Sequence, residues 1–228
     1  MGEKWNTPLA REAGVRATTA KNMFPRLYPI IDPALLPGAG DQAARVAAFA
    51  RELVEGGATL IQYRNKTGSG RQMLSDAREL RRALGTEVRL IMNDRADLCL
   101  AAGFDGVHVG QEDLSPEGAR AVVGDQLWVG VSTHSVEQVM HADQTSADYI
   151  AIGPVFSTAS KQNPDPVVGL EGVRAARAAT RKPLVAIGGI TRVNCASVIH
   201  AGADSVAIIS DLVHDPAKSV EAFLRVLG

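Results

Sequence analysis

Short apolar segments alternate with longer amphipathic segments along the chain from Leu27 onward. The short segments are apolar along most of their length and rich in Val and Ile, which is typical of parallel strands buried on both faces. We expect strands at 27–32, 59–64, 88–93, 105–110, 127–132, 148–153, 183–188 and 204–210. The longer segments have a helical period, and we expect helices near 41–56, 70–84, 95–102, 115–123, 135–146, 169–180, 191–201 and 216–227.

Turn residues separate these segments where a helix should give way to a strand. Glycine stands at that point in EGGAT, AAGFDG and HAGADS, as expected for helix C-termini. Ser115 precedes Pro116, which predicts an N-cap followed by proline in the first helical turn. Eight βα units predict a single (β/α)8 TIM barrel over residues 26–228. An open doubly wound sheet is the alternative, but no Gly-x-Gly-x-x-Gly follows the first strand to support dinucleotide binding.

Composition and charge restrict the classes of partner. The chain has 228 residues, 21% charged residues and a net charge of −1, which argues against nucleic acid and anionic membranes as partners. No apolar run approaches the ~20 residues of a membrane span, and residues 1–25 lack the apolar core of a signal peptide. We expect those residues to form an arm, partly helical or disordered. Oligomeric state is left open, and a homo-oligomer is compatible with the sequence.

The chain has two cysteines, Cys99 and Cys195, and no Cys-x-x-Cys motif. Both lie in expected helices, which predicts buried, unpaired thiols rather than a disulfide framework. A reducing compartment suits that pattern, so we expect a cytoplasmic protein.

Polar residues gather at the carboxyl ends of the expected strands, where barrel active sites lie. They comprise, in chain order, Gln62, Arg64, Lys66, Asn93, Asp94, His108, Gln111, Asp113, Ser132, His134, Thr158, Ser160, Lys161 and Ser210. Taken singly, most have a structural interpretation: Asp94 could cap a helix, His108 could be a core histidine, and the others could lie in solvated loops. Their gathering at one end favours a site. We expect Glu112, His134, His141, His200 and His214 to be surface or capping residues.

Glycines at the ends of the last two strands suggest a phosphate site. Phosphate sites in barrels commonly form from the loops after strands seven and eight. Gly188 and Gly189 end the seventh expected strand and would let backbone N–H groups approach a phosphate. Ser210, at the end of the eighth, could add a hydroxyl.

Two carboxylates from adjacent strands could share one hard cation. Mg²⁺ usually takes one or two carboxylates plus water and phosphate oxygens, so Asp94 and Asp113 are the expected ligands. The neighbouring cations Arg64, Lys66 and Lys161 make sense if a polyanion bridges them to the metal, and a departing pyrophosphate fits. One pyrophosphate site and one monophosphate site suggest an enzyme that joins two phosphorylated substrates.

The sequence resembles the thiamine-phosphate synthase family. The resemblance rests on QYRNK, NDRADLCLAAGFDGVHVGQEDL, GVSTHS, DYIAIGPVFSTASK, GLEGVRA, AIGGI and GADSVAIIS, which follow the family's order. It implies a barrel that condenses 4-amino-2-methyl-5-hydroxymethylpyrimidine pyrophosphate with a thiazole phosphate, giving thiamine phosphate and pyrophosphate. It also implies a dissociative mechanism in which pyrophosphate leaves a pyrimidine cation before the thiazole nitrogen attacks.

The resemblance further implies roles for the rim residues. Gln62, Arg64, Lys66 and Asn93 would face the pyrimidine pyrophosphate, with His108 lining the pyrimidine pocket. Asp94 and Asp113 would hold Mg²⁺. Ser132 and Lys161 would contact the pyrophosphate and, with Arg64 and Lys66, form the catalytic set. Thr158, Ser160, Gly189, Ile209 and Ser210 would bind the thiazole phosphate.

One departure and several alternatives remain. Ser160 stands where the family often has threonine, which keeps the hydroxyl, and the following QNPDPVVGLE could reshape a lid over the thiazole site. A thiazole tautomerase-like relative would not need the cations and both carboxylates together. A non-catalytic barrel that sequesters a phosphorylated ligand, or a phosphosugar isomerase, are further alternatives.

Overall fold

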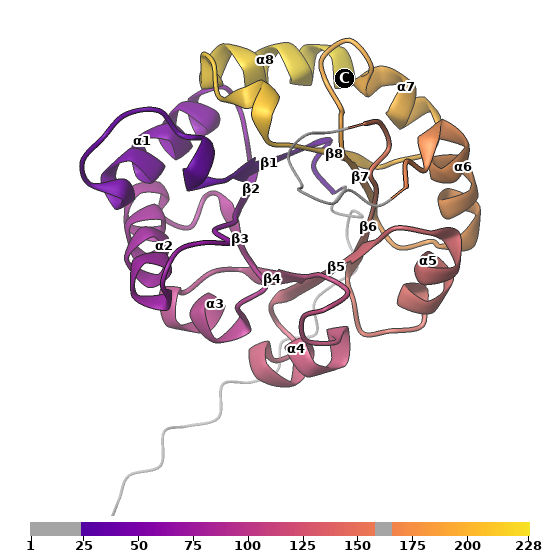
Figure 1. The fold of residues 1–228 in the computed structure, drawn as a ribbon, viewed down its shortest axis with the longest axis horizontal. Coiled ribbons are helices and arrows are strands. Elements are labelled where there is room, and N and C mark those ends of the chain that lie inside the picture. Colours follow the sequence, from indigo (N-terminus) through magenta and orange to yellow (C-terminus); the bar gives the residue numbers. More distant parts are fainter. Residues whose placement is uncertain (1–23, 158–165) are drawn as a thin grey trace, which may run out of the picture.

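The computed structural model describes residues 24–157 and 166–228, and these form a closed barrel of eight parallel strands (Figure 1). The strands occur around the barrel in chain order, and β8 pairs with β1 to close it. Their bounds are β1 Leu27–Ile31, β2 Leu60–Tyr63, β3 Arg89–Asn93, β4 Gly106–Val109, β5 Trp128–Thr133, β6 Tyr149–Ile152, β7 Leu184–Ile187 and β8 Ser205–Ile208. The predicted (β/α)8 barrel is therefore confirmed, and the open sheet is excluded.

The helices lie outside the barrel, one after each strand (Figure 1). They are α1 Gln42–Glu55, α2 Gly70–Leu84, α3 Ala96–Ala102, α4 Pro116–Val123, α5 Val136–Asp143, α6 Gly169–Ala179, α7 Cys195–His200 and α8 Pro216–Leu227, with short 3-10 helices η1 Pro33–Leu35 and η2 Ser210–Leu212. Ser115 caps α4 as predicted, accepting from the N–H of Gly118. Within residues 24–157 and 166–228, no helix combines the length and apolar character that crossing a bilayer requires.

Two apolar layers hold the barrel together. The larger lies between strands and helices, and the smaller fills the lumen. Phe24, which we assigned to the N-terminal arm, is buried in the lumen and stacks on Trp128 with ring centroids 5.3 Å apart. Trp128 begins β5, so these rings pack at the amino ends of the strands.

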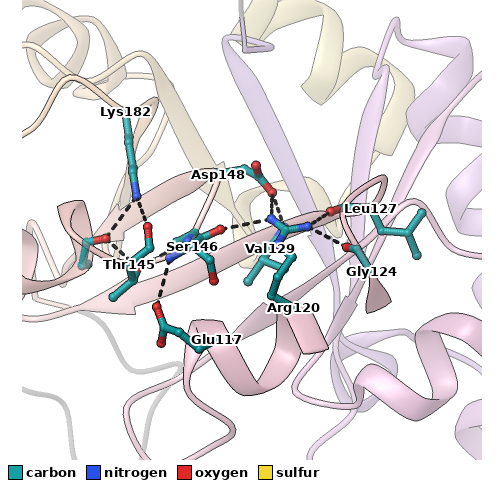
Figure 2. A network of polar contacts seen from close by, with 11 residues as sticks. Glu117, Arg120, Gly124, Leu127, Val129, Thr145, Ser146, Asp148 and Lys182 are labelled. Atoms are coloured by element: carbon teal, nitrogen blue, oxygen red, sulfur yellow. Dashed lines mark hydrogen bonds and ion pairs between the residues drawn. The ribbon is translucent and has the colours of Figure 1, made fainter. Parts of the chain in front are cut away.

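Arginine–aspartate clamps tie the loops together at the amino ends of the strands. In Figure 2, Arg120 of α4 donates to the carbonyls of Gly124, Leu127 and Ser146, and pairs with Asp148 at 2.6 Å. The same Asp148 carboxylate accepts from the backbone N–H of Val129 at 2.7 Å. One side chain thus closes the end of α4 and joins it to the starts of β5 and β6.

The clamp recurs at α2 and α6 among the described residues. Arg81 of α2 pairs with Asp105 before β4, and Arg177 of α6 pairs with Asp204 before β8. Each of these aspartates also accepts from a backbone N–H in the intervening strand. In TIM barrels the face at the amino ends of the strands serves stability, which leaves the carboxyl ends for function.

Candidate active site

A cavity of about 670 Å³ opens among the loops at the carboxyl ends of the strands. The predicted site residues that the structure describes all line it: Gln62, Arg64, Lys66, Asn93, Asp94, His108, Asp113, Ser132, Gly189, Ile209 and Ser210. Three further predicted residues, Thr158, Ser160 and Lys161, lie outside the described residues. The barrel therefore brings together side chains that are up to 148 positions apart in the sequence, from Gln62 to Ser210.

The end of β2 supplies the cations. Gln62, Arg64 and Lys66 line the cavity, whereas Tyr63 packs in the layer between barrel and helices. This is the period-2 alternation of a strand, continued past the last strand residue. The guanidinium of Arg64 pairs with the carboxylate of Asp32, which follows β1.

The ends of β3 and β4 supply the carboxylates. Asp94 accepts a hydrogen bond from Lys66 Nζ at 2.5 Å, and Asp113 accepts from the backbone N–H of Gly110 at 2.8 Å. The pKa of Asp94 is raised, mainly because burial disfavours its charge and also because the Asp113 carboxyl group is close, although Lys66 opposes the shift. Both carboxyl groups line the same cavity.

Asp94 is not the cap of the following helix. The N-cap position of α3 is Arg95, which makes no side-chain capping bond. Asp94 itself has φ +61°, a left-handed conformation that is uncommon outside glycine and tolerated best by Asn and Asp. Its backbone N–H donates to the carbonyl of His108 on β4 at 2.8 Å, which fixes its carboxylate beside Lys66.

The donor set of Asp94 and Asp113 fits a hard divalent cation. Two carboxylates are as many as Mg²⁺ usually takes from a protein when substrate phosphates and water complete its shell. The described part of the chain contains no group of three or more His, Cys, Asp or Glu residues arranged to hold a metal by themselves. An ion here would therefore depend on substrate oxygens.

A chain of hydrogen bonds crosses the lumen below these charges. Gln62 Nε2 donates to the Tyr28 hydroxyl at 3.0 Å, and Tyr28 and Tyr149 share a hydroxyl–hydroxyl bond of 2.8 Å. The chain continues from Tyr149 to His108 Nδ1 at 3.0 Å, and from His108 Nε2 to Ser132 Oγ at 2.8 Å. Burial lowers the pKa of His108 to about 4, so its imidazole is neutral at pH 7 and both ring nitrogens are satisfied.

The turn after β7 is shaped by its two glycines. Gly188 and Gly189 have φ +98° and +64°. A Cβ on Gly188 would lie 2.6 Å from Pro154 Cα, and one on Gly189 would lie 2.5 Å from the carbonyl oxygen of Ser157. The turn therefore needs glycine both for its dihedral angles and for close packing on the loop after β6.

Asn194 secures the same turn from the other side. Its Nδ2 donates to the carbonyl of Gly189 at 3.0 Å, and its Oδ1 accepts from the N–H of Thr191 at 2.7 Å. Gly189, Thr191, Ile209 and Ser210 all line the cavity, so this rigid turn forms its wall beside η2. Asn194 was not among the predicted site residues. It carries no charge, and it lies outside the cavity lining.

Some cavity residues were also missed or misplaced by the sequence analysis. His134 was predicted to be a surface or capping residue, but it is half-buried, lines the cavity, and its Nδ1 bonds the carbonyl of Gly153 at 2.6 Å. That expectation was wrong for His134, whereas Glu112 is exposed as predicted, at the mouth of the cavity that it also lines. His141, His200 and His214 are exposed as predicted. Tyr28 was missed because its strand, β1, is apolar and gives no rim signal.

Comparison with known proteins identifies the family. The family model described as thiamine monophosphate synthase matches residues 27–212, which is most of the chain and the whole barrel up to η2. This chain belongs to the thiamine monophosphate synthase family.

Individual members of the thiamine monophosphate synthase family agree with this assignment. The thiamine-phosphate synthase of Koribacter versatilis (strain Ellin345) is 62% identical over 204 residues, covering 90% of this chain and 96% of the relative. The thiamine-phosphate synthase of Chloroflexus aurantiacus is 44% identical over 205 residues, covering 89% of this chain and 90% of the relative. The solved structure of thiamine phosphate pyrophosphorylase from Pyrococcus furiosus superposes with a TM-score of 0.78 at 34% identity, covering 89% of this chain and 95% of that one.

Proposed function

We propose that the cavity performs the thiamine-phosphate synthase reaction with the residues assigned below. That the chain is a thiamine-phosphate synthase, a transferase of thiamine biosynthesis, follows from its family and from relatives that carry this name along nearly its full length. The substrates are small phosphorylated molecules, a pyrimidine pyrophosphate and a thiazole phosphate. A tautomerase-like or purely sequestering barrel is not favoured.

One observation carries the assignment of roles: the cavity has two separate regions suited to anions. The region at β2 to β4 combines Arg64 and Lys66 with the paired carboxylates Asp94 and Asp113. The region at β7 and β8 is built from the glycine turn and η2. A reaction with one pyrophosphate and one monophosphate needs both regions.

The pyrophosphate of the pyrimidine substrate binds at the first region. Arg64 and Lys66 contact its oxygens, joined by Asn93, by Ser132 from β5 and by Lys161 from the loop after β6. Charge-assisted hydrogen bonds of this kind are shorter and about twice as strong as neutral ones. Lys66 pairs with Asp94 in the free enzyme. When the pyrophosphate binds, Lys66 therefore exchanges this carboxylate partner for a phosphate oxygen.

Mg²⁺, when bound at Asp94 and Asp113, supplies positive charge that stabilises the leaving pyrophosphate. Before substrate arrives, the carboxylate of Asp94 balances the positive charge of Lys66. Burial and the nearby Asp113 raise the pKa of Asp94 because they disfavour its ionised form, and a divalent cation at this site would favour that form.

The pyrimidine ring enters the lumen between the polar chain and the apolar strand residues. Gln62 and His108 lie on its wall, and Ile30, Ala151 and Val185 provide apolar surface. The neutral imidazole of His108 can neither repel nor protonate the ring at pH 7, so its role is to shape and orient the pocket. A flat heterocycle with polar edges fits such a wall.

The reaction exchanges one bond at the pyrimidine methylene. The methylene C–O bond breaks, and its electron pair leaves with pyrophosphate, held by Arg64, Lys66, Ser132 and Lys161. The resulting cation is attacked by the lone pair of the thiazole nitrogen, which forms the new C–N bond. No proton is transferred in this step, so the residues act by binding, orienting and electrostatic stabilisation.

The thiazole phosphate binds at the second region. Thr158 and Ser160 donate hydroxyls, and the backbone at Gly189, Ile209 and Ser210 completes the site. The Gly188–Gly189 turn packs closely against Pro154 and Ser157, and Thr158 and Ser160 follow these residues in the sequence, which supports the grouping. We also assign the reaction to the cytoplasm, which is consistent with two free, buried cysteines.

Pyrophosphate release by the purified chain tests this proposal. With both heterocyclic substrates and Mg²⁺ we expect stoichiometric pyrophosphate and thiamine phosphate, and we expect EDTA to stop the reaction. The Arg64→Ala and Lys66→Ala variants should raise the KM for the pyrimidine pyrophosphate and leave the KM for the thiazole phosphate unchanged. Turnover unaffected by both substitutions would exclude the assigned pyrophosphate site, even if the activity itself is present.

A further inference from the structure

A fully buried carboxylate lies behind the loop that carries the two cations. Asp76 of α2 has no exposed surface and occurs in none of the ion pairs among the described residues. It accepts instead from three neutral donors: Gln42 Nε2 at 2.7 Å, Gln72 Nε2 at 2.7 Å and the Tyr63 hydroxyl at 2.6 Å. Burying a carboxylate without a cation is strongly unfavourable unless hydrogen bonds compensate. An apolar side chain at this helix position would avoid that cost.

The Tyr63 hydroxyl links Asp76 to the loop that carries Arg64 and Lys66. It accepts from Asn65 Nδ2 at 3.1 Å while donating to Asp76. Burial, then the bond to Asp76, raises the pKa of Tyr63 far above its usual value. The hydroxyl therefore keeps its proton and its direction of donation at any pH at which the protein works.

Asn65 is the contact with the loop backbone. Its Oδ1 accepts from the N–H groups of Thr67 and Gly68 at 3.2 and 2.7 Å. The amide is closely enclosed, because a Cβ on Gly68 would lie 2.4 Å from Asn65 Nδ2. Asn65 itself is only 8% exposed, so both ends of its amide are held by protein.

The loop is therefore fixed on its outer side at every second residue. Tyr63 and Asn65 point away from the cavity, and the alternate residues Arg64 and Lys66 line it. The backbone of Arg64 is also tied to β1, since its N–H donates to the carbonyl of Ile31 at 2.9 Å. The contacts of the outward side chains thus fix the backbone positions from which Arg64 and Lys66 extend into the cavity.

We infer that Tyr63, Asn65 and Asp76 form a buried brace whose function is to position Arg64 and Lys66 for the pyrophosphate of the pyrimidine substrate. None of the three touches the cavity, so they are positioning residues and not catalytic ones. The inference rests on the proposed function of Arg64 and Lys66. Displacing a catalytic group by about 1 Å can cost on the order of 100-fold in rate, which is why a rigid support repays the burial of Asp76.

The test is steady-state kinetics with each substrate varied in turn. Asn65→Ala removes the contact to the loop, and Tyr63→Phe removes the link to Asp76 while keeping the ring. We expect each to lower kcat/KM for the pyrimidine pyrophosphate by about 10-fold or more and to leave the KM for the thiazole phosphate unchanged. Asn65→Asp keeps an oxygen that can accept from Thr67 and Gly68 but loses the amide donor to Tyr63, so its kcat/KM should lie between those of Asn65→Ala and wild type.

A double-mutant cycle separates positioning from general damage. In a background with Arg64→Ala and Lys66→Ala, Asn65→Ala should have almost no further effect, because the groups it positions are gone. Arg120→Met, at the opposite end of the barrel, serves as a control for lost stability and should not change either KM. Equal losses for both substrates, or an undiminished effect in the double-alanine background, would overturn the brace.

The same experiment distinguishes failure of the brace from failure of the proposed function. If Arg64→Ala and Lys66→Ala raise the KM for the pyrimidine pyrophosphate but Asn65→Ala and Tyr63→Phe do not, the brace is refuted and the assigned site stands. If neither alanine variant affects that KM, the assigned site is itself refuted.

Discussion

Lys66 and Asp94 form an ion pair across two neighbouring strands, with Lys66 Nζ 2.5 Å from the Asp94 carboxylate. Lys66 follows β2 and Asp94 follows β3, and both line the cavity. The pair joins the cation set to the carboxylate set at one point. Under the proposed roles, pyrophosphate and Mg²⁺ would both reorganise this contact when they bind.

The first prediction concerns the metal. Asp113→Asn keeps an oxygen that can accept from the Gly110 N–H but removes the charge, and we expect it to raise the Mg²⁺ concentration for half-maximal turnover by about 10-fold or more. Titration of Mg²⁺ at saturating substrates measures this. Asp97→Asn is the control, since Asp97 is exposed and pairs with Arg95 on the surface. An identical Mg²⁺ response in Asp113→Asn and wild type would remove Asp113 from the metal site.

The second prediction concerns the turn after β7. Asn194→Ala deletes the bonds to the Gly189 carbonyl and the Thr191 N–H, so the phosphate-facing backbone loses its support. The KM for the thiazole phosphate should rise by about 10-fold, with no change in the KM for the pyrimidine pyrophosphate. His200→Ala, exposed at the end of the same helix, should match wild type. A rise confined to the pyrimidine substrate would contradict the assignment of the two anion regions.

The third prediction concerns stability at the amino ends of the strands. Arg120→Met removes a charged donor that serves three carbonyls and Asp148. We expect a loss of about 2 kcal/mol in the free energy of unfolding and a fall in Tm of about 4–8 °C. Arg174→Met breaks an exposed pair with Glu171 and should cost about 0.5 kcal/mol or less. Thermal melts of both variants make the comparison, and similar losses would show that the clamp contributes no more than a surface pair.

The fourth prediction concerns thiol reactivity. Burial, and next the charge of Asp105, raises the pKa of Cys99 to about 12, and burial raises the pKa of Cys195. A raised thiol pKa means that the reactive thiolate forms only at higher pH, so at pH 8 about one Cys99 in 10⁴ is ionised. Native protein should resist Ellman's reagent, and both cysteines should react in guanidinium. Rapid labelling of native protein would show that one of the thiols is accessible.

Much of the fold could be predicted from local patterns. Period-2 and period-3.6 repeats identify all eight βα units, and Ser115 and the glycines mark their ends, because these signals depend only on near neighbours in the sequence. That the described candidate residues would lie together at the carboxyl ends of the strands was also predictable. Once the strands are parallel and closed, every loop after a strand lies at one end.

The partners of those residues were not predictable from local patterns. His108 meets Tyr149, Ser132 meets His108, and Tyr28 meets Tyr149 over 121 positions of sequence. Nothing in the apolar pattern of β1 or β6 indicates which tyrosine points into the lumen, because a residue's face depends on strand register.

The sequence alone determined the number and order of the βα units, the end of the barrel that carries charge, and the family. The tertiary structure decided the pairs: Lys66 with Asp94, Arg64 with Asp32, and Asp76 behind Tyr63 and Asn65. Periodicity fixes the direction of a side chain relative to its own element. Only closure of the barrel and its register fix which side chain from another element stands opposite. Hydrogen bonds and ion pairs depend on the distance between these two side chains.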